Sequence, residues 1–188
     1  MRKLLVFNLI TLDGFFEGPN QSIDWHSVDE EFNEFAVEQL ATLDMIVFGR
    51  VTYQGMAGFW PTPFALETDP VIAGKMNSAS KIVISRTLDK AEWNNTRLIK
   101  DNVAQEMARL KQQPGQDLAI FGSANLTASL LKMGLIDEIR VIVNPLVLGH
   151  GTPLFQNVTD PIKLKLLKSR TFGNGNVLLC YQVVLPPH

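Results

Sequence analysis

The sequence predicts an α/β domain in which one mixed sheet carries helices on both faces, giving three layers. Up to Gly134, short apolar runs alternate with amphipathic stretches at helical period, which is typical of parallel strands joined by crossover helices. Beyond that point only strand-like runs follow, and the last two flank Gly173-Asn174-Gly175, a hairpin signal. The 188 residues suit a single domain over residues 1–188, and 46% hydrophobic residues are enough to form its core.

Each predicted strand is a short apolar run bounded by polar or turn-forming residues. The first run, residues 3–10, is nearly all apolar, as expected of a strand that is covered on both faces. The predicted strands span residues 3–10, 44–48, 81–85, 97–99, 118–121, 138–147, 163–172 and 176–184.

Helices are predicted between several of these strands. Ser27 and Glu30 have the spacing of a capping box, so the first helix is expected to begin at Ser27. A further helix follows Gly49, and the segment 59–70, which holds three prolines, is expected to be a loop. The other expected helices span residues 102–113, capped by Asn102, and 123–133, stopped by Gly134.

Composition argues against several classes of protein. The formal net charge is −2 and the basic residues are spread along the chain, which does not suit a nucleic-acid partner. Cys180 is the one cysteine, so neither an internal disulfide nor a cysteine-based metal site is expected. His26, His150 and His188 show no metal-ligand spacing, and no metal is expected. No apolar stretch reaches the ~20 residues that a membrane span needs, so we expect a cytoplasmic protein without a membrane partner.

The turn after residue 48 is the clearest candidate for binding a phosphate, because helix N-termini present free N–H groups and the positive end of the helix dipole. Gly49 permits a tight turn, Arg50 supplies a forked cation, and Thr52 can cap the next helix or donate to a phosphate. An ordinary glycine turn with a solvated arginine explains the same residues, and this turn alone does not decide between the two interpretations.

Two more turns follow strands of the same sheet. Ser85 and Arg86 end a strand and could hold the 2′-phosphate that distinguishes NADPH from NADH. In the other turn Ser123 is a suitable N-cap, and Gly122-Ser123-Ala124 leaves room for a pyrophosphate or a nicotinamide amide. Each turn alone also fits a solvated strand end or plain helix capping. Three such turns in series predict an NADPH site, although neither a G-x-G-x-x-G fingerprint nor a P-loop is present.

Several short motifs occur in one order along residues 3–184. They are Thr11-Leu12-Asp13-Gly14, Gly49-Arg50-Val51-Thr52-Tyr53, Ile84-Ser85-Arg86-Thr87, Phe121-Gly122-Ser123, Gly134-Leu135-Ile136-Asp137-Glu138 and Pro145-Leu146-Val147-Leu148-Gly149-His150-Gly151. This series resembles the dihydrofolate reductase-like superfamily, and within it the reductase (C-terminal) domain of the riboflavin-biosynthesis deaminase–reductase. The chain has no H-x-E with a following C-x-x-C, which excludes a zinc deaminase site in it.

The resemblance implies a twisted sheet of about eight strands, mostly parallel with an antiparallel C-terminal edge, and hydride transfer from NADPH. It places Ser85 and Arg86 at the adenosine 2′-phosphate, and Asp13, in a loop over the nicotinamide, near the substrate as a binding and catalytic residue. The branch usually has two glycines before the third helix, where this chain has Phe121-Gly122. The implied cofactor-binding residues are Gly49, Arg50, Thr52, Ser85, Arg86, Gly122, Ser123 and Ala124.

Reduction of a C=N bond needs a proton as well as a hydride. Dihydrofolate reductases use an acid early in the first helix, and matching their acid and the Phe four residues later gives Glu31 and Phe35. A half-buried carboxyl at this position would have a raised pKa, as a general acid requires, whereas a solvated glutamate in the first turn is the alternative. Trp25, just upstream, could stack on a flat heterocycle or fill the core.

Together these features favour an NADPH-dependent reductase of a flat nitrogen heterocycle. The 5-amino-6-(5-phosphoribosylamino)uracil of riboflavin biosynthesis is the preferred substrate, and dihydrofolate or a pteridine is the alternative. A non-catalytic nucleotide-binding module is the alternative from a different class of protein. The apolar C-terminal hairpin also makes a homodimer plausible.

Overall fold

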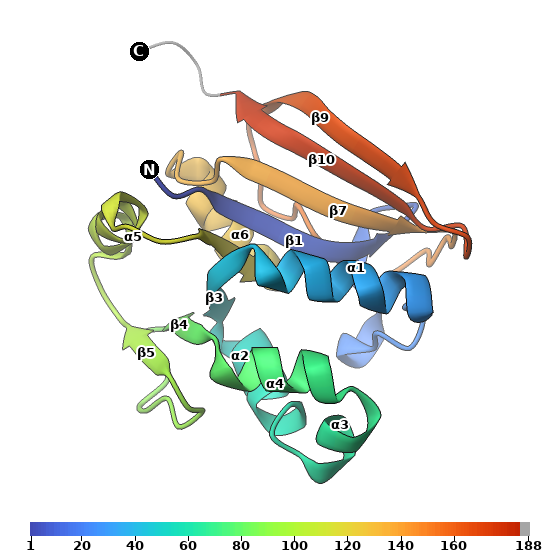
Figure 1. Ribbon diagram of the computed structural model, residues 1–188. Coiled ribbons are helices and arrows are strands. Elements are labelled where there is room, and N and C mark those ends of the chain that lie inside the picture. Colours follow the sequence, from blue (N-terminus) through green and yellow to red (C-terminus); the bar gives the residue numbers. More distant parts are fainter. Residues whose placement is uncertain (185–188) are drawn as a thin grey trace.

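The computed structural model describes residues 1–184, so His188 lies outside the described residues. Its main strands are β1 (Leu4–Thr11), β3 (Leu43–Gly49), β4 (Ser80–Ile84), β5 (Thr96–Ile99), β6 (Asp117–Phe121), β7 (Glu138–Asn144), β9 (Lys163–Thr171) and β10 (Val177–Val184). They form one sheet in the order β5-β4-β3-β6-β1-β7-β10-β9 (Figure 1). Neighbours from β5 to β7 are parallel, whereas β10 runs antiparallel to both β7 and β9. The predicted mixed sheet with an antiparallel C-terminal hairpin is therefore confirmed.

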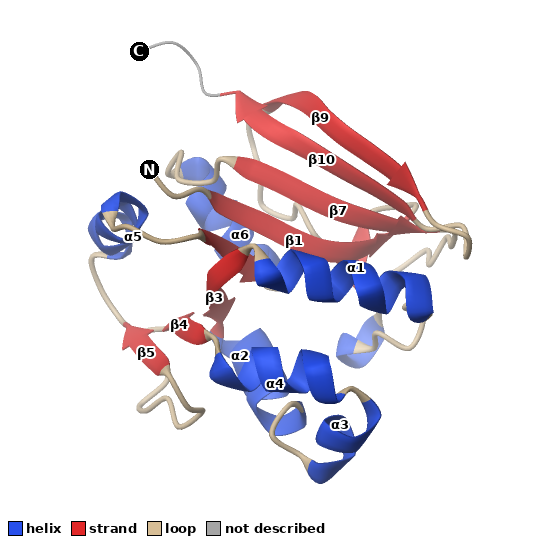
Figure 2. Ribbon diagram, viewed as in Figure 1, coloured by secondary structure: helices blue, strands red, loops and turns tan. Residues whose placement is uncertain are grey.

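Helices cover both faces of this sheet, as Figure 2 shows. They are α1 (Glu30–Ala41), α2 (Arg50–Phe59), α3 (Pro63–Thr68), α4 (Pro70–Ser78), α5 (Val103–Gln112) and α6 (Ala124–Lys132). The side chains of β3 alternate between the two cores that result. Val47 packs in the cluster that holds Leu110 of α5 and Leu126 of α6, whereas Phe48 packs with Tyr53 of α2 and residues of α4. The three predicted layers follow from this alternation.

The segment 59–70, expected to be a loop, contains a helix instead. Residues 63–68 form α3, and α4 begins at Pro70. Both prolines stand at the first helical position, where the missing N–H would have no partner in any case. Thr62 caps α3 by accepting a hydrogen bond from the Ala65 N–H. Pro63 and Pro70 therefore start helices, whereas Pro61 lies in the turn before α3, and the expectation of a loop over the whole segment was wrong.

The first helix begins later than the capping-box spacing predicts. Asp29 is its N-cap, and the Asp29 carboxylate accepts a hydrogen bond from the Phe32 N–H at 2.8 Å. The backbone of Ser27 is engaged elsewhere, because its N–H donates to Asn144 Oδ1 and its carbonyl accepts from Asn176 Nδ2. These long-range contacts hold residue 27 outside the helix.

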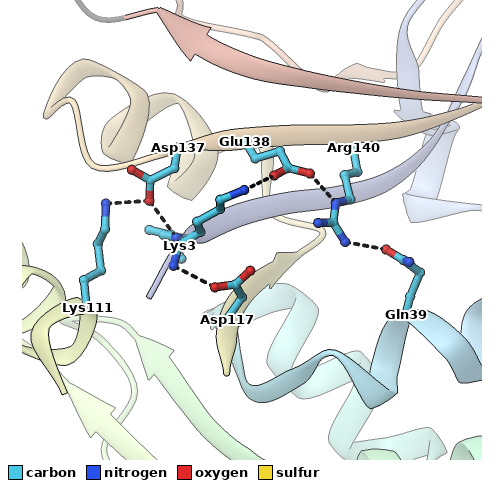
Figure 3. A network of polar contacts seen from close by, with 8 residues as sticks. Lys3, Gln39, Lys111, Asp117, Asp137, Glu138 and Arg140 are labelled. Atoms are coloured by element: carbon cyan, nitrogen blue, oxygen red, sulfur yellow. Dashed lines mark hydrogen bonds and ion pairs between the residues drawn. The ribbon is translucent and has the colours of Figure 1, made fainter. Parts of the chain in front are cut away.

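A polar network links the amino ends of the parallel strands, at the end of the sheet opposite the Gly49 and Gly122 turns (Figure 3). Glu138, which is 4% exposed, accepts from Arg140 Nε at 2.6 Å and from Lys3 Nζ at 3.2 Å. Lys111 of α5 pairs with Asp137 at 2.6 Å, and Arg140 also donates to Gln39 of α1. The network joins β1 and β7 to a helix on each face, so it stabilises the end of the sheet that does not carry the candidate site.

Two short strands form a separate ribbon beyond the carboxyl end of the main sheet. β2 (Phe15–Glu17), which follows β1, pairs antiparallel with β8 (Thr152–Pro153), which follows β7. β7 itself ends at Asn144, before the predicted residue 147. Over residues 1–184, no helix is both long and apolar enough to cross a bilayer. In the same range no three His, Cys, Asp or Glu side chains gather as a metal site would require.

Candidate active site

The carboxyl ends of β3 and β6 lie side by side, and the chain leaves them in opposite directions. From β3 it passes through α2 toward β4, while from β6 it passes through α6 toward β7 on the other side of β1. The two helices pack in different cores, on opposite faces of the sheet. Such a switch point opens a crevice at the strand ends, which is where open α/β sheets bind their ligands.

The two turns at this crevice interlock through their glycines. A Cβ on Gly49 would overlap the Ser123 Oγ, and a Cβ on Gly122 would lie 2.7 Å from Thr52 Cγ2 and 2.8 Å from Thr52 Oγ1. Each turn therefore places a hydroxyl-bearing side chain in the space that the other leaves by having no side chain. The pairing fixes the two helix N-termini relative to one another.

The turn after β6 has a left-handed backbone at two successive residues. Gly122 has φ +67° and Ser123 has φ 59°, so the pair that needs positive φ is Gly122-Ser123. Phe121 ends the strand and packs between Phe7 and Phe48, with ring centroids 5.7 and 6.4 Å away. The bulky Phe121 thus stays in the aromatic core and does not occupy the turn, and Ser123 holds a conformation that costs a non-glycine residue about 1 kcal/mol or more.

Backbone donors face the crevice at both helix starts. Within residues 1–184, neither Gly49 at α2 nor Ser123 at α6 supplies a side-chain cap, so the first-turn N–H groups keep their hydrogen-bonding capacity. Arg50 is exposed at the start of α2, and its Nη1 donates to Gln54 Oε1 at 3.0 Å. Thr52 sits inside the first turn and is not the cap. This set of groups suits an anion such as a pyrophosphate.

A pocket of about 530 Å³ occupies the crevice. Its lining combines the two turns with the start of α6, the end of β4 and the β2–β8 ribbon. The residues are Phe16, Glu17, Gln21, Gly49, Arg50, Val51, Thr52, Ile84, Ser123, Ala124, Asn125, Leu126, Ser129, Thr152 and Gln156. Five of the eight predicted cofactor residues line it, namely Gly49, Arg50, Thr52, Ser123 and Ala124, while Gly122 abuts the Thr52 side chain. The size and the polar lining fit a nucleotide.

The two predicted residues at the end of β4 do not line this pocket. Ser85 is buried, and its Oγ accepts hydrogen bonds from the Leu88 N–H at 3.0 Å and the Thr87 N–H at 3.2 Å. Arg86 is exposed and makes no ion pair within the described residues. The hydroxyl of Ser85 therefore serves its own turn, and the exposed guanidinium of Arg86 has no ion-pair partner among residues 1–184.

Asp13 holds the loop after β1 to the loop after β7. Its carboxylate accepts hydrogen bonds from Thr11 Oγ1 at 2.6 Å, the Gly149 N–H at 2.8 Å and the Leu148 N–H at 3.1 Å. The Thr11 hydroxyl and these backbone donors lower the pKa of Asp13 to about 2. A carboxyl in this state is ionised near neutral pH and has no proton to give.

Glu31 is also engaged, which contradicts the expected rise of its pKa. Its carboxylate accepts from the Gly173 N–H at 2.8 Å and pairs with Arg170 at 2.9 Å. The Gly173 N–H and the Arg170 guanidinium lower the pKa of Glu31. Both partners come from the C-terminal hairpin, so Glu31 links α1 to that hairpin.

Trp25 and His26 lie in the segment that leads into α1. Their rings pack edge to face, with the two ring centroids 4.5 Å apart. Trp25 Nε1 and His26 Nε2 are both buried without a hydrogen-bond partner in the described structure, and burial lowers the pKa of His26 to about 4. Two orphaned polar atoms side by side are unfavourable unless something else satisfies them, which suits a place where a ligand or a water binds.

A second pocket, of about 580 Å³, lies at the opposite end of the sheet. It is lined by the starts of β4 and β5 and by Arg109 and Gln113 at the end of α5. Helix C-termini present carbonyl groups and a negative dipole end, which disfavour phosphate. Arg97 and Arg109 there both pair with Glu106. We therefore place the candidate site in the pocket of about 530 Å³ at the crevice between the two turns.

Several residues of the site were not predicted from the sequence. Asn8, 6% exposed, accepts the Gly122 N–H on its Oδ1 at 2.9 Å, and its Nδ2 is buried without a partner in the described residues. A polar residue within an otherwise apolar strand was the available signal. Glu17 and Thr152 face each other across the β2–β8 ribbon, and Thr152 Oγ1 donates to Glu17 Oε1 at 2.8 Å. Because they are far apart in the sequence, no local pattern marks this pair.

The sheet order and the crevice define an α/β protein with the dihydrofolate reductase-like fold. The chain belongs to the RibD C-terminal domain family, whose sequence profile matches residues 2–178. Two Bacillus subtilis (strain 168) proteins, both named as uncharacterized, are similar over most of their length. YyaP is 35% identical over 182 residues, covering 96% of this chain and 94% of its own. YwjB is 30% identical over 176 residues, which cover 93% of this chain and 94% of YwjB.

Solved structures agree on the fold. A putative riboflavin biosynthesis protein from Shewanella sp. PV-4 superposes with a TM-score of 0.75 at 22% identity, covering 97% of this chain and 99% of its own. The Thermotoga maritima deaminase/5-amino-6-(5-phosphoribosylamino)uracil reductase superposes with a TM-score of 0.67 at 13% identity, and the match covers 97% of this chain and 57% of that chain. Enterococcus faecalis dihydrofolate reductase, complexed with NADP(H), superposes with a TM-score of 0.65 at 14% identity, and the match covers 96% of each chain.

Proposed function

We propose that the protein is an NADPH-dependent reductase of a flat nitrogen heterocycle. The observation that carries this proposal is the polar pocket at the switch point, where two interlocked turns present free backbone N–H groups beside Arg50. Family membership supports it, because the Thermotoga maritima relative of this fold is a reductase by name. The name of that enzyme makes 5-amino-6-(5-phosphoribosylamino)uracil the first substrate to test.

In this proposal the pyrophosphate of NADPH binds between the two helix starts. Arg50, Thr52 and Ser123 would hold its oxygens together with the first-turn N–H groups, and Ala124 leaves space beside them. Arg86, which is exposed just after the end of β4, would reach the 2′-phosphate. When bound, NADPH would supply a hydride to a C=N bond of the substrate, and the proton that completes this reduction would come from solvent water.

The chain's own acids would bind and orient rather than donate a proton. Asp13 and Glu31 both have lowered pKa values and are ionised near neutral pH. Asp13 fixes the loop over the proposed nicotinamide end, and Glu31 fixes the start of α1. Trp25 remains the proposed contact for the heterocycle, since its Nε1 is a buried donor without a partner in the described residues.

A substrate screen tests the proposal. Purified protein is mixed with NADPH and, in turn, with 5-amino-6-(5-phosphoribosylamino)uracil, dihydrofolate and dihydropterin, and the absorbance of NADPH is followed. Consumption with the pyrimidine alone supports the favoured substrate, and consumption with dihydrofolate or a pterin shifts the assignment to those compounds. NADPH binding without turnover on any related heterocycle would identify a nucleotide-binding module and contradict the reductase assignment.

A further inference from the structure

The pocket is also lined by a carboxylate that belongs to neither of the two turns. Glu17 lines the pocket beside Thr152, and Thr152 Oγ1 donates to Glu17 Oε1 at 2.8 Å. Over residues 1–184 the other carboxylate oxygen, Oε2, accepts no hydrogen bond, and Glu17 forms no ion pair. An anionic acceptor with one fixed oxygen and one unengaged oxygen therefore borders the pocket.

The backbone around this carboxylate is held in place. β2 and β8 pair at Glu17 and Thr152, and the neighbouring Gly151 has φ +151°. A Cβ on Gly151 would overlap the carbonyl oxygen of Glu17, so the two segments approach as closely as glycine allows. Glu17 is thus positioned by the ribbon and by the Thr152 hydroxyl, and is not a loosely solvated surface residue.

A carboxylate at this place suits one part of a dinucleotide and repels another. It only accepts hydrogen bonds, so it disfavours a phosphate and favours hydroxyl groups. The part of the pocket formed by Arg50, Ser123 and the two helix starts has the reverse preference. A ribose diol linked to a pyrophosphate suits both parts of the pocket, because acidic residues bind ribose hydroxyls in other dinucleotide sites.

The sheet order indicates which ribose lies near Glu17. Along the crevice the strand ends follow the order β4, β3, β6 and β1, and Glu17 is in the ribbon after β1. Three strand spacings, about 14 Å, separate β1 from β4, where Arg86 stands. A 2′-phosphate held near Arg86 puts the adenosine ribose at the far end from Glu17. The ribose near Glu17 is then the one next to nicotinamide, and both of its hydroxyls are free.

We propose that Glu17 accepts hydrogen bonds from the hydroxyls of the nicotinamide ribose and that Thr152 positions its carboxylate. The inference rests on the proposed NADPH-binding function, and it assigns a residue that the sequence motifs do not mark. It also predicts that the two halves of the cofactor respond differently to changes at residue 17.

The test measures binding of NADPH, of adenosine 2′,5′-bisphosphate and of reduced nicotinamide mononucleotide by calorimetry, for wild type and variants. Glu17→Ala should weaken NADPH and the nicotinamide half on the order of tenfold or more, because a hydrogen bond to a charged acceptor is lost. Glu17→Gln should fall between wild type and Ala. Thr152→Val, which keeps the carboxylate but frees it to rotate, should weaken both ligands less than Glu17→Ala. Adenosine 2′,5′-bisphosphate should bind all variants within about twofold of wild type.

Matched controls keep the outcomes distinct. Glu67→Gln, an exposed carboxylate of α3 outside the pocket, should leave all three affinities unchanged. Melting temperatures of the ligand-free variants show that each is folded. An unchanged NADPH affinity in Glu17→Ala, or an equal loss for the adenosine half, would overturn the role of Glu17 while leaving NADPH binding intact. Wild-type protein that binds neither NADPH nor adenosine 2′,5′-bisphosphate would overturn the proposed function itself.

Discussion

Replacing Gly122 by alanine should lower the free energy of unfolding of the protein. Alanine at φ +67° takes a left-handed conformation, which costs about 1–2 kcal/mol. Its Cβ would also lie 2.7 Å from Thr52 Cγ2 and 2.8 Å from Thr52 Oγ1, with the Thr52 Cβ at 3.3 Å. Because Thr52 is branched, rotation cannot remove both contacts, and such overpacking costs about 1–3 kcal/mol. The expected loss is about 2–5 kcal/mol in the free energy of unfolding.

Urea unfolding and thermal melting measure this loss, which corresponds to roughly 4–20 °C in melting temperature. Thr52→Ala in the Gly122→Ala background should recover the overpacking part, leaving about 1–2 kcal/mol from the backbone. Gly58→Ala in α2 is the control, since no atom lies within 4 Å of the position that a Cβ would take there, and it should stabilise by about 0.5–1 kcal/mol. Wild-type stability in Gly122→Ala, with no dependence on Thr52, would refute the interlocking of the turns.

Three further predictions concern acid stability, cofactor choice and assembly. Burial raises the pKa of Glu138, but the ion pairs with Arg140 and Lys3 outweigh burial and lower the pKa below 4.5. The contribution of Glu138 to the free energy of unfolding is therefore complete above pH 4.5 and is lost as the pH falls through the lowered pKa. Glu138→Gln should therefore cost about 2–4 kcal/mol at pH 7 and less at pH 3, and an equal cost at both pH values would contradict the pairing. Arg86→Ala should weaken NADPH more than NADH in a fluorescence titration, and equal losses would remove Arg86 from the 2′-phosphate. The expected homodimer should sediment at twice the monomer mass, and Leu166→Lys on the exposed edge strand β9 should shift it toward monomer; a wild-type monomer at all concentrations would end that expectation.

Apolar patterning predicted the sheet because β1, β3 and β6 are covered on both faces, and their runs admit few polar residues. The turns at Gly49 and Gly122 could be recognised because glycine and small hydroxyl residues follow those runs directly. Pro63 and Pro70 were misread, since a proline at the first position of a helix looks the same in sequence as a proline in a loop. The difference depends on which residues the segment packs against.

Contacts between distant residues explain what could not be predicted at the site. The pKa of Glu31 is set by Arg170 and Gly173, which a different part of the chain brings to α1. Asn8 reaches the Gly122 turn only because β1 and β6 are neighbours in the sheet. Side chains of this kind take their role from strand order, and strand order is not visible in any short stretch of sequence.

NADPH binding to the wild-type protein tests the central claim most directly. The protein is titrated with NADPH while nicotinamide fluorescence is recorded, and its melting temperature is measured at saturating ligand. We predict saturable binding, with about 2.7 kcal/mol of added stability at a free ligand concentration 100 times the Kd. Unchanged NADPH fluorescence, together with an unchanged melting temperature in both NADPH and NADP, would contradict the assignment of the crevice between β3 and β6 as a cofactor site.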